Sequence, residues 1–190
     1  MDGTREQDRL DWSTHTVTAP QHFPSDRPLS DRQLPDRQAP DRKRVALIAS
    51  SGGHWIELTR LSPAVQHLDC LFISTTHGLT APFGTRPVAQ IMDGSRDTPW
   101  LLVRSIGGIV KTLRDFRPDV VITTGAAPGA VALLIGKMLG AVTIWTDSVA
   151  NSEELSLSGK FARGFADLRL TQWEHLACPQ QQISYLGRVL

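Results

Sequence analysis

The chain has 190 residues, with 20 Lys and Arg against 19 Asp and Glu and a formal net charge of +1. This balance argues against bulk electrostatic binding of nucleic acid, so no nucleic-acid partner is expected. No apolar run reaches the roughly 18 residues of a membrane span, and charged residues stand where a signal peptide needs an apolar core. Two cysteines without metal-ligand spacing favour free thiols in a reducing compartment, and no metal site is expected.

The composition changes near residue 44. Residues 1–43 are polar, carry five of the twelve prolines and repeat Asp-Arg every five residues from Asp26-Arg27 to Asp41-Arg42. A period of five fits neither helix nor strand, and proline removes backbone donors, so a disordered tail is predicted, with a solvated spacer favoured over a binding motif. Residues 44–190 are predicted to form one folded domain of ordinary size.

The stretch from Arg44 to His54 predicts a buried strand, a small-residue turn and a helix start. The apolar run Val45–Ala49 ends at Ser50-Ser51-Gly52-Gly53-His54. Unpaired N–H groups and the helix dipole stabilise an anion at such a junction, although the same pattern also forms plain corners in α/β folds. The spacing matches neither standard phosphate loop, so nucleotide hydrolysis and a dinucleotide cofactor are not expected.

The next segments alternate helix and strand. Apolar residues at helical spacing follow His54, and Ser62-Pro63 can restart that helix as N-cap and first residue. Strands are predicted at 69–75 and 88–92. The helix predicted at 100–116 is amphipathic, which suits either packing on a sheet or contact with a membrane interface.

A second junction repeats the first. A strand predicted at 119–125 runs into the loop Gly125-Ala126-Ala127-Pro128-Gly129, followed by a helix at 130–139. Loops at the carboxyl ends of parallel strands can line one crevice, where open α/β sheets bind ligands. Further strands are predicted at 141–145, 168–171 and 183–186, with a turn at 156–160 and a short helix after it. The alternation predicts an α/β fold with a Rossmann-like parallel sheet flanked by helices and joined by right-handed crossovers.

Five motifs that carry these junctions occur in a fixed order. They are Ser-Ser-Gly-Gly-His at 50–54, Arg-Pro-Asp-Val-Val-Ile-Thr-Thr-Gly-Ala-Ala-Pro-Gly at 117–129, Asp-Ser-Val-Ala at 147–150, Leu-Ser-Leu-Ser-Gly-Lys at 155–160 and Ala-Asp-Leu-Arg-Leu-Thr-Gln-Trp at 166–173. As a set they resemble the acceptor-side subunit of the bipartite N-acetylglucosaminyltransferase of lipid-linked oligosaccharide synthesis and its bacterial capsule and exopolysaccharide relatives. The resemblance covers about residues 44–190, and extends more weakly to the amino-terminal half of the single-chain transferase acting on the lipid-linked peptidoglycan precursor.

This resemblance implies one half of a family-28-like GT-B glycosyltransferase. In that fold the carboxyl-terminal half holds the nucleotide sugar and the amino-terminal half holds the lipid-linked acceptor. Because the sequence ends at Leu190, a separate chain is expected to supply the UDP-sugar site, so this chain would bind no cofactor and would be inactive alone. The resemblance also implies a cytoplasmic protein peripherally associated with the inner face of the membrane, where it meets the lipid-linked acceptor.

Three positions depart from the relatives' pattern. Asp147 stands where Glu is frequent, Asn151 where Arg is common, and Glu174 where Pro often follows Gln-Trp. A shorter acid and a missing cation can alter acceptor contacts, so the acceptor's identity does not carry over. The eukaryotic subunit also has an amino-terminal membrane anchor, where this chain has the tail rich in Pro, Asp and Arg.

The resemblance and the two junctions together suggest roles for named residues. His54 is the first candidate for the base that takes the acceptor's proton and Asp147 the second, because a base must reach that proton. The alternative for His54 is helix capping or packing, and the alternative for Asp147 is capping the turn that follows it. The expected acceptor and phosphate contacts are Ser51, Gly52, Gly53, His54, Glu57, Gly125, Ala126, Ala127, Pro128, Gly129 and Ser148.

The carboxyl-terminal segment is expected to face the partner chain. The expected contacts are Trp173, Tyr185 and Gly187, although Trp173 could instead stack on a sugar ring, whereas core packing is favoured for Trp145. Two other interpretations remain open: a non-catalytic α/β protein that binds a sugar phosphate, and a truncated copy of a single-chain transferase.

Overall fold

The computed structural model describes residues 42–91 and 99–189, with side chains described from residue 104 onward in the second range. Apart from residues 42 and 43, the predicted tail lies outside the described residues, as does Met92 of the strand predicted at 88–92. Within the described ranges, no helix is long and apolar enough to cross a membrane.

A seven-stranded sheet in the order β3-β2-β1-β4-β5-β6-β7 forms the centre of the domain, and every neighbouring pair is parallel. The prediction of a Rossmann-like parallel sheet is therefore confirmed. The strand order reverses between β1 and β4, where Val45 pairs with Val120 and Ile48 with Thr123. The strands are β1 Arg44–Ala49, β2 Asp69–Ser74, β3 Ala89–Gln90, β4 Val120–Thr123, β5 Val142–Thr146, β6 Leu168–Thr171 and β7 Ile183–Tyr185.

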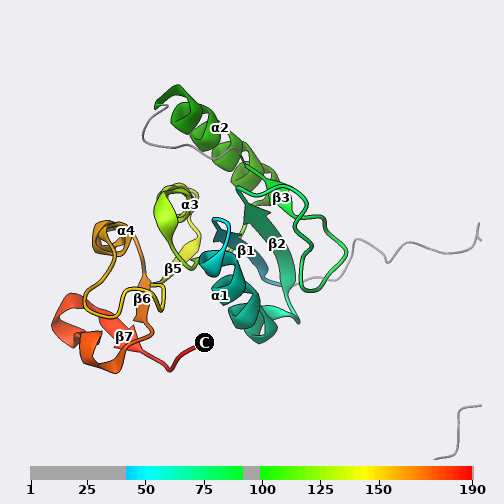
Figure 1. Ribbon diagram of the computed structural model, residues 1–190. Helices are drawn as coiled ribbons and strands as arrows, with labels where there is room; N and C mark the ends of the chain where they lie inside the picture. The colour runs from blue at the N-terminus through cyan, green and yellow to red at the C-terminus, as the bar shows by residue number, and fades with distance from the viewer. Residues whose placement is uncertain (1–41, 92–98, 190) are drawn as a thin grey trace, which may run out of the picture. The chain divides into compact units, whose positions relative to one another are not determined.

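Helices cover both faces of the sheet (Figure 1). Alternate residues of β1 point to opposite faces, so Ala46 and Ile48 join the core under α2 and α3, while Val45 and Leu47 join the core under α1. The burial of Ile109 and Leu113 in the first core supports sheet packing for this part of α2. The helices are α1 Gly53–Leu61, α2 Pro99–Phe116, α3 Ala126–Met138 and α4 Leu157–Phe161, with short 3₁₀ turns η2 Ser62–Val65, η3 Ala162–Gly164, η4 Glu174–Leu176 and η5 Pro179–Gln181.

Helix α3 begins four residues earlier than the sequence predicts. Ala126 to Gly129 form its first turn rather than a loop. Pro128 is compatible with this turn because the first N–H groups of a helix have no intrahelical acceptor to lose. The glycine at 129 is required by space, since a Cβ there would overlap Oγ1 of Thr123 on β4.

Two smaller differences have similar local causes. Ser62 does not cap the turn after α1, because its hydroxyl donates to the carbonyl of Thr59 at 2.7 Å. The predicted turn at 156–160 is mostly helix α4, because the Ser156 hydroxyl accepts from the Gly159 N–H at 2.9 Å and caps the helix. The predicted strand at 168–171 coincides with β6.

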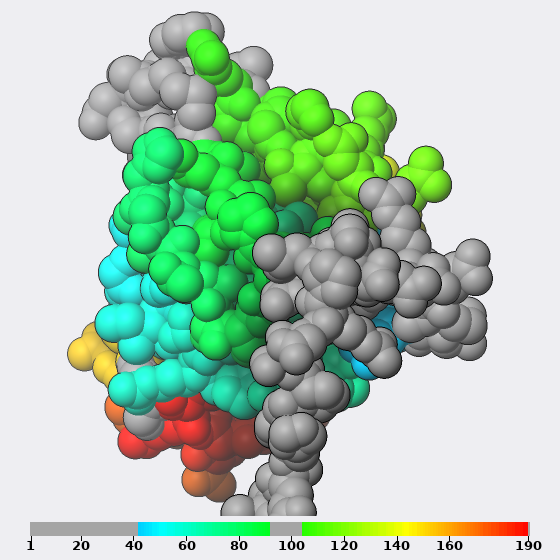
Figure 2. Space-filling model, turned by 90° about the vertical axis from the view of Figure 1, so that its right-hand side faces the viewer, coloured from blue at the N-terminus to red at the C-terminus, as the bar shows by residue number. Residues whose placement is uncertain are grey.

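The carboxyl-terminal segment returns to the first helix. After β7, the backbone N–H of Val189 donates to the Gln172 side chain at 3.1 Å, and the Val189 carbonyl lies 3.4 Å from Nη1 of Arg60 on α1. In Figure 2 the red carboxyl-terminal residues lie directly below blue-green residues from the first half of the domain. The carboxyl-terminal segment therefore lies against helix α1.

Candidate functional site

The candidate site lies at the carboxyl ends of β1, β4 and β5, beside the reversal in strand order. Helix α1 starts after β1 and helix α3 starts after β4. The N-cap residues are Gly52 and Gly125, and neither helix has a side chain capping its first N–H groups. Two positive helix ends with available donors therefore meet at one edge of the sheet, as the sequence predicts.

Three residues at these helix starts have positive φ angles. Gly52 has φ 71°, Gly125 has φ 134° and Ala126 has φ 63°. Glycine at 125 also makes room for a side chain, since a Cβ there would lie 2.8 Å from Cε1 of His54. The backbone strain of Ala126 and the close approach at Gly125 both lie next to the imidazole ring.

His54 joins the two helix starts through two hydrogen bonds to Thr124. Its Nδ1 lies 3.0 Å from the Thr124 carbonyl oxygen, and the Thr124 hydroxyl donates to the His54 carbonyl at 2.7 Å. A carbonyl oxygen can only accept, so Nδ1 carries the proton. Within the described residues Nε2 makes no hydrogen bond, and it is the ring nitrogen available to a ligand.

Glu57 lies one helical turn after His54 and is 1% exposed. Its Oε1 accepts from the Ser148 hydroxyl at 2.8 Å and from the Val149 N–H at 2.9 Å. Its Oε2 lies 3.8 Å from Nδ1 of His54 and has no hydrogen-bond partner within the described part of the chain. The 3.8 Å separation exceeds hydrogen-bond range, so we describe this contact as an ion pair.

The contact between His54 and Glu57 shifts the pKa of each side chain. The Glu57 carboxylate raises the pKa of His54 above its ordinary value of 6.5, against the lowering effect of burial, and the Thr124 carbonyl and Asp147 add to the rise. Burial by itself would raise the pKa of Glu57, but His54 and the donors of Ser148 and Val149 outweigh it and lower that pKa.

Asp147 is 2% exposed and accepts from three donors. Its Oδ1 accepts from the Ser148 N–H at 3.1 Å and the Asn151 side chain at 2.9 Å, and its Oδ2 accepts from the Ser156 N–H at 2.9 Å. These bonds hold the segment between β5 and α4, residues 147–156, which we call the β5–α4 loop. The geometry favours a structural role for this carboxylate over contact with a substrate.

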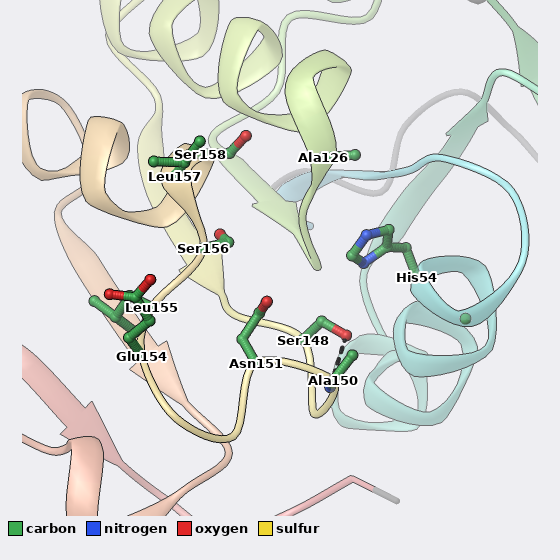
Figure 3. A pocket seen from close by; sticks show the side chains of 11 residues that line it. His54, Ala126, Ser148, Ala150, Asn151, Glu154, Leu155, Ser156, Leu157 and Ser158 are labelled. Atoms are coloured by element: carbon green, nitrogen blue, oxygen red, sulfur yellow. Dashed lines mark hydrogen bonds between the residues drawn. The ribbon is translucent and has the colours of Figure 1, made fainter.

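A cavity of about 600 Å³ opens between the starts of α1 and α3 and the β5–α4 loop. Figure 3 shows the His54 imidazole extending from α1 beneath Ala126, with Ser148 below it and Asn151 and Ser156 across from it. The cavity is lined by Gly53, His54, Ala126, Ser148, Ala150, Asn151, Glu154, Leu155, Ser156, Leu157 and Ser158.

Of the predicted contact residues, four line this cavity: Gly53, His54, Ala126 and Ser148. Glu57 and Asp147 lie buried behind its wall, so their influence on a ligand is indirect. The other predicted positions, which are not among the lining residues, are Ser51, Gly52, Gly125, Ala127, Pro128 and Gly129. Their roles in binding stay predictions.

The contribution of residues 154–158 to the cavity was not predicted from the sequence. The motif at 155–160 was noted, but its place opposite His54 depends on Asp147 and on the Ser156 cap, which fold the loop back. Asn151, noted as a departure, also lines the cavity. Within the described residues, no group of three or more His, Cys, Asp or Glu side chains could hold a metal ion.

The three predicted partner contacts lie near the last strand. Trp173 is partly buried, its indole N–H donates to the Val149 carbonyl at 2.8 Å, and the Arg188 guanidinium lies 4.1 Å from its ring centre. Tyr185 ends the edge strand β7, and Gly187 is exposed. Trp145, by contrast, is 1% exposed, as favoured from sequence. Whether a partner binds this edge stays a prediction.

Part of the chain is similar in sequence to two known transferase subunits. The chain is 32% identical over 80 residues to the UDP-N-acetylglucosamine transferase subunit ALG14 of Mus musculus, covering 39% of this chain and 37% of that protein. It is 35% identical over 77 residues to the alg14 subunit of Schizosaccharomyces pombe, with 38% and 37% covered. The match therefore spans less than two fifths of these curated relatives.

Solved structures share the fold at low sequence identity. MurG of Acinetobacter baumannii superposes with a TM-score of 0.60 at 15% identity, covering 75% of this chain and 45% of that chain. UDP-N-acetylglucosamine 2-epimerase of Rickettsia bellii gives 0.60 at 15% identity, with 78% and 46% covered. At these identities the likeness establishes the fold, one Rossmann-like half of the GT-B type.

The family comparison covers the second half of the site. The model of the family described as "Oligosaccharide biosynthesis protein Alg14 like" matches residues 85–189, more than half of the chain, and includes the start of α3 and the β5–α4 loop. The junction at 50–54 lies outside the matched range. The chain belongs to the Alg14-like family of oligosaccharide biosynthesis proteins.

Proposed function

We propose that this chain is the acceptor-binding subunit of a two-chain glycosyltransferase. The enzyme would transfer N-acetylglucosamine or a related hexose from a UDP-sugar to a lipid-linked glycan. Membership of the Alg14-like family and relatives named as UDP-N-acetylglucosamine transferase subunits support the transferase role. The UDP-sugar site would belong to a separate chain, and the acceptor would be presented at the cytoplasmic surface of the membrane.

One observation supports acceptor binding by this chain more than any other. The starts of α1 and α3 and the free Nε2 of His54 meet at a cavity of about 600 Å³ that remains open to solvent on one side. Unpaired N–H groups and helix dipoles stabilise a phosphate, while an imidazole nitrogen can accept a proton from a hydroxyl. A sugar linked through phosphate to a lipid needs both kinds of group.

In the proposed reaction His54 is the base. Its Nε2 removes the proton from the acceptor hydroxyl as that oxygen bonds to the donor sugar carbon, and the bond from that carbon to the UDP oxygen breaks with inversion. Because Nδ1 keeps its proton and donates it in a hydrogen bond to the Thr124 carbonyl, Nε2 is the nitrogen that accepts the hydroxyl proton. The raised pKa of His54 makes Nε2 a stronger base for the hydroxyl proton.

The proposed partner contacts involve the carboxyl-terminal edge. Trp173, Tyr185 and Gly187 lie at or beside β7, an edge strand of the described sheet in which Ile183 also forms an antiparallel bridge with Cys178. Leu186, 76% exposed, adds apolar surface between the last two of these residues. A second chain that covered this edge could bring its nucleotide-sugar site toward the carboxyl ends of the strands.

The test is reconstitution of the reaction. The chain is co-expressed with candidate nucleotide-sugar-binding partner chains, and each purified complex is assayed with a panel of UDP-sugars and lipid diphosphate-linked acceptors. Transfer by the complex, with none from either chain alone, is expected. His54→Ala should lower kcat by about 100-fold or more, as for loss of a general base, while His77→Ala at an exposed position should not.

Two results would contradict the proposal. Full activity of the partner chain without this chain would remove the need for an acceptor-binding subunit. A chain that binds sugar phosphates but supports no transfer with any partner or acceptor would instead indicate a non-catalytic binding protein.

A further inference from the structure

A buried carboxylate connects the two walls of the cavity without touching its interior. Glu57 is 1% exposed on α1 and lies 91 positions before Ser148 in the sequence, yet its Oε1 accepts from both Ser148 and Val149. Ser148 lines the cavity, and Glu57 does not. The carboxylate thus fixes the β5–α4 loop against the helix that carries His54.

The second oxygen of Glu57 faces the imidazole. Oε2 is buried, makes no hydrogen bond within the described residues and lies 3.8 Å from Nδ1 of His54. An isolated buried charge is costly, so an ionised carboxylate in this position needs a positive partner. Among the described residues, the side chain that pairs with Glu57 and can carry a positive charge is His54.

We propose that Glu57 is a positioning residue for His54. One oxygen holds the β5–α4 loop, and the other orients the imidazole with Nε2 toward the cavity and stabilises its protonated form. This inference rests on the proposed function for the identity of the reaction, but the arrangement of the pair is testable without any substrate.

The role follows the proton through the proposed step. When Nε2 takes the proton of the acceptor hydroxyl, the neutral imidazole becomes an imidazolium. Glu57 remains ionised, and its negative charge offsets the new positive charge. The proton later leaves Nε2 for solvent. This restores the neutral ring, in which Nδ1–H still donates to the Thr124 carbonyl. A fixed carboxylate beside a histidine base serves this purpose in general acid–base catalysis.

Other charges around the imidazole act in both directions. Asp147 at the end of β5 favours the protonated ring and adds to the rise in the pKa of His54. The positive N-terminal end of α3 opposes it. Glu154 lines the far side of the cavity, where Lys160 of α4 pairs with it at 2.7 Å. Glu57 is the nearest carboxylate and the largest influence on His54.

The direct test is titration of His54 by NMR in the full chain, with its resonances assigned from a His54→Asn variant. In the wild type, ring ¹⁵N shifts should show the Nδ1-protonated form at high pH and a midpoint above 6.5. Glu57→Gln keeps an oxygen acceptor for Ser148 and Val149 but removes the charge, so the midpoint should move to lower pH. Glu153→Gln, an exposed neighbour of the same loop, should leave it unchanged.

Ser148→Ala completes the comparison. It removes one bond to Oε1 and leaves Oε2 in place, so the midpoint of His54 should stay closer to the wild-type value than in Glu57→Gln. If Glu57→Gln does not fold, the wild type still decides: a midpoint below 6.5 or an Nε2-protonated neutral ring would overturn the proposal. An unchanged midpoint in a folded Glu57→Gln variant would overturn it as well.

Kinetics with the partner chain separates this inference from the proposed function. Glu57→Gln should lower kcat by roughly tenfold or more, with a shifted pH profile and little change in KM for the acceptor. If the wild-type complex transfers no sugar, the proposed function fails, while the NMR result on Glu57 still stands or falls independently.

Discussion

Replacing Gly125 by alanine tests the packing that fixes His54. Gly125 has φ 134° and ψ −166°, a region open essentially to glycine alone, so alanine there should cost about 1–3 kcal/mol in backbone strain. Its Cβ would also lie 2.8 Å from Cε1 and 3.0 Å from Nδ1 of His54. The ring must move, and its bond to the Thr124 carbonyl should be lost, for about 1 kcal/mol more.

The matched control is Gly52→Ala. Gly52 occupies the same N-cap position of α1 with φ 71°, but nothing lies within 4 Å of a Cβ built there. Both variants should lower the free energy of unfolding, measured by urea denaturation with tryptophan fluorescence. The loss of unfolding free energy should be about 1 kcal/mol larger in Gly125→Ala than in Gly52→Ala. Of the two variants, only Gly125→Ala should change the NMR signals of His54. An equal or smaller loss in Gly125→Ala would refute the packing argument.

Three further predictions concern stability and reactivity. Gly136→Ala places a Cβ 2.6 Å from Cγ2 of Val121 and should lower the free energy of unfolding, measured by urea denaturation, by about 1–3 kcal/mol. Gly107→Ala, with nothing within 4 Å of its Cβ, should leave that free energy unchanged or raise it. Equal effects would contradict the packing of α3 on β4. Burial, with Asp69 nearby, raises the pKa of Cys70 to about 11, so iodoacetamide at pH 8 should label it far more slowly in native protein than in urea; similar rates would show an accessible thiolate. The difference in free energy of unfolding between wild type and His54→Asn should be largest between pH 4.5 and 6.5, the ordinary pKa values of Glu57 and His54. It should fall as the pH rises further, because the raised pKa of His54 means that the folded state favours the protonated ring. A difference independent of pH would contradict the ion pair.

The sequence was sufficient for elements whose pattern is local. In the strand at 168–171 Leu168 and Leu170 alternate with Arg169 and Thr171, and its predicted limits coincide with β6. The strands after Arg44 and Asp119 are short apolar runs bounded by polar or small residues, which explains why the sheet and the two junctions were predicted.

The remaining differences depend on contacts distant in sequence. The early start of α3 relies on the positive φ of Ala126, which a residue with a Cβ rarely adopts and no local pattern signals. The sequence places Glu57 in the helix after His54 but gives no sign that it is buried. The β5–α4 loop reaches it only because the folded sheet brings β5 close to α1. The contribution of residues 154–158 likewise depends on Asp147, whose three hydrogen bonds close the loop.

Photo-cross-linking addresses the central claim, that this chain and not its partner holds the acceptor. A lipid diphosphate sugar with a photoreactive group near the diphosphate is bound to the two-chain complex, irradiated and mapped by mass spectrometry. The account predicts labels on this chain in peptides that contain residues 53–54, 126 and 148–158, with loss of labelling when unmodified acceptor competes. Labels confined to the partner chain would contradict it.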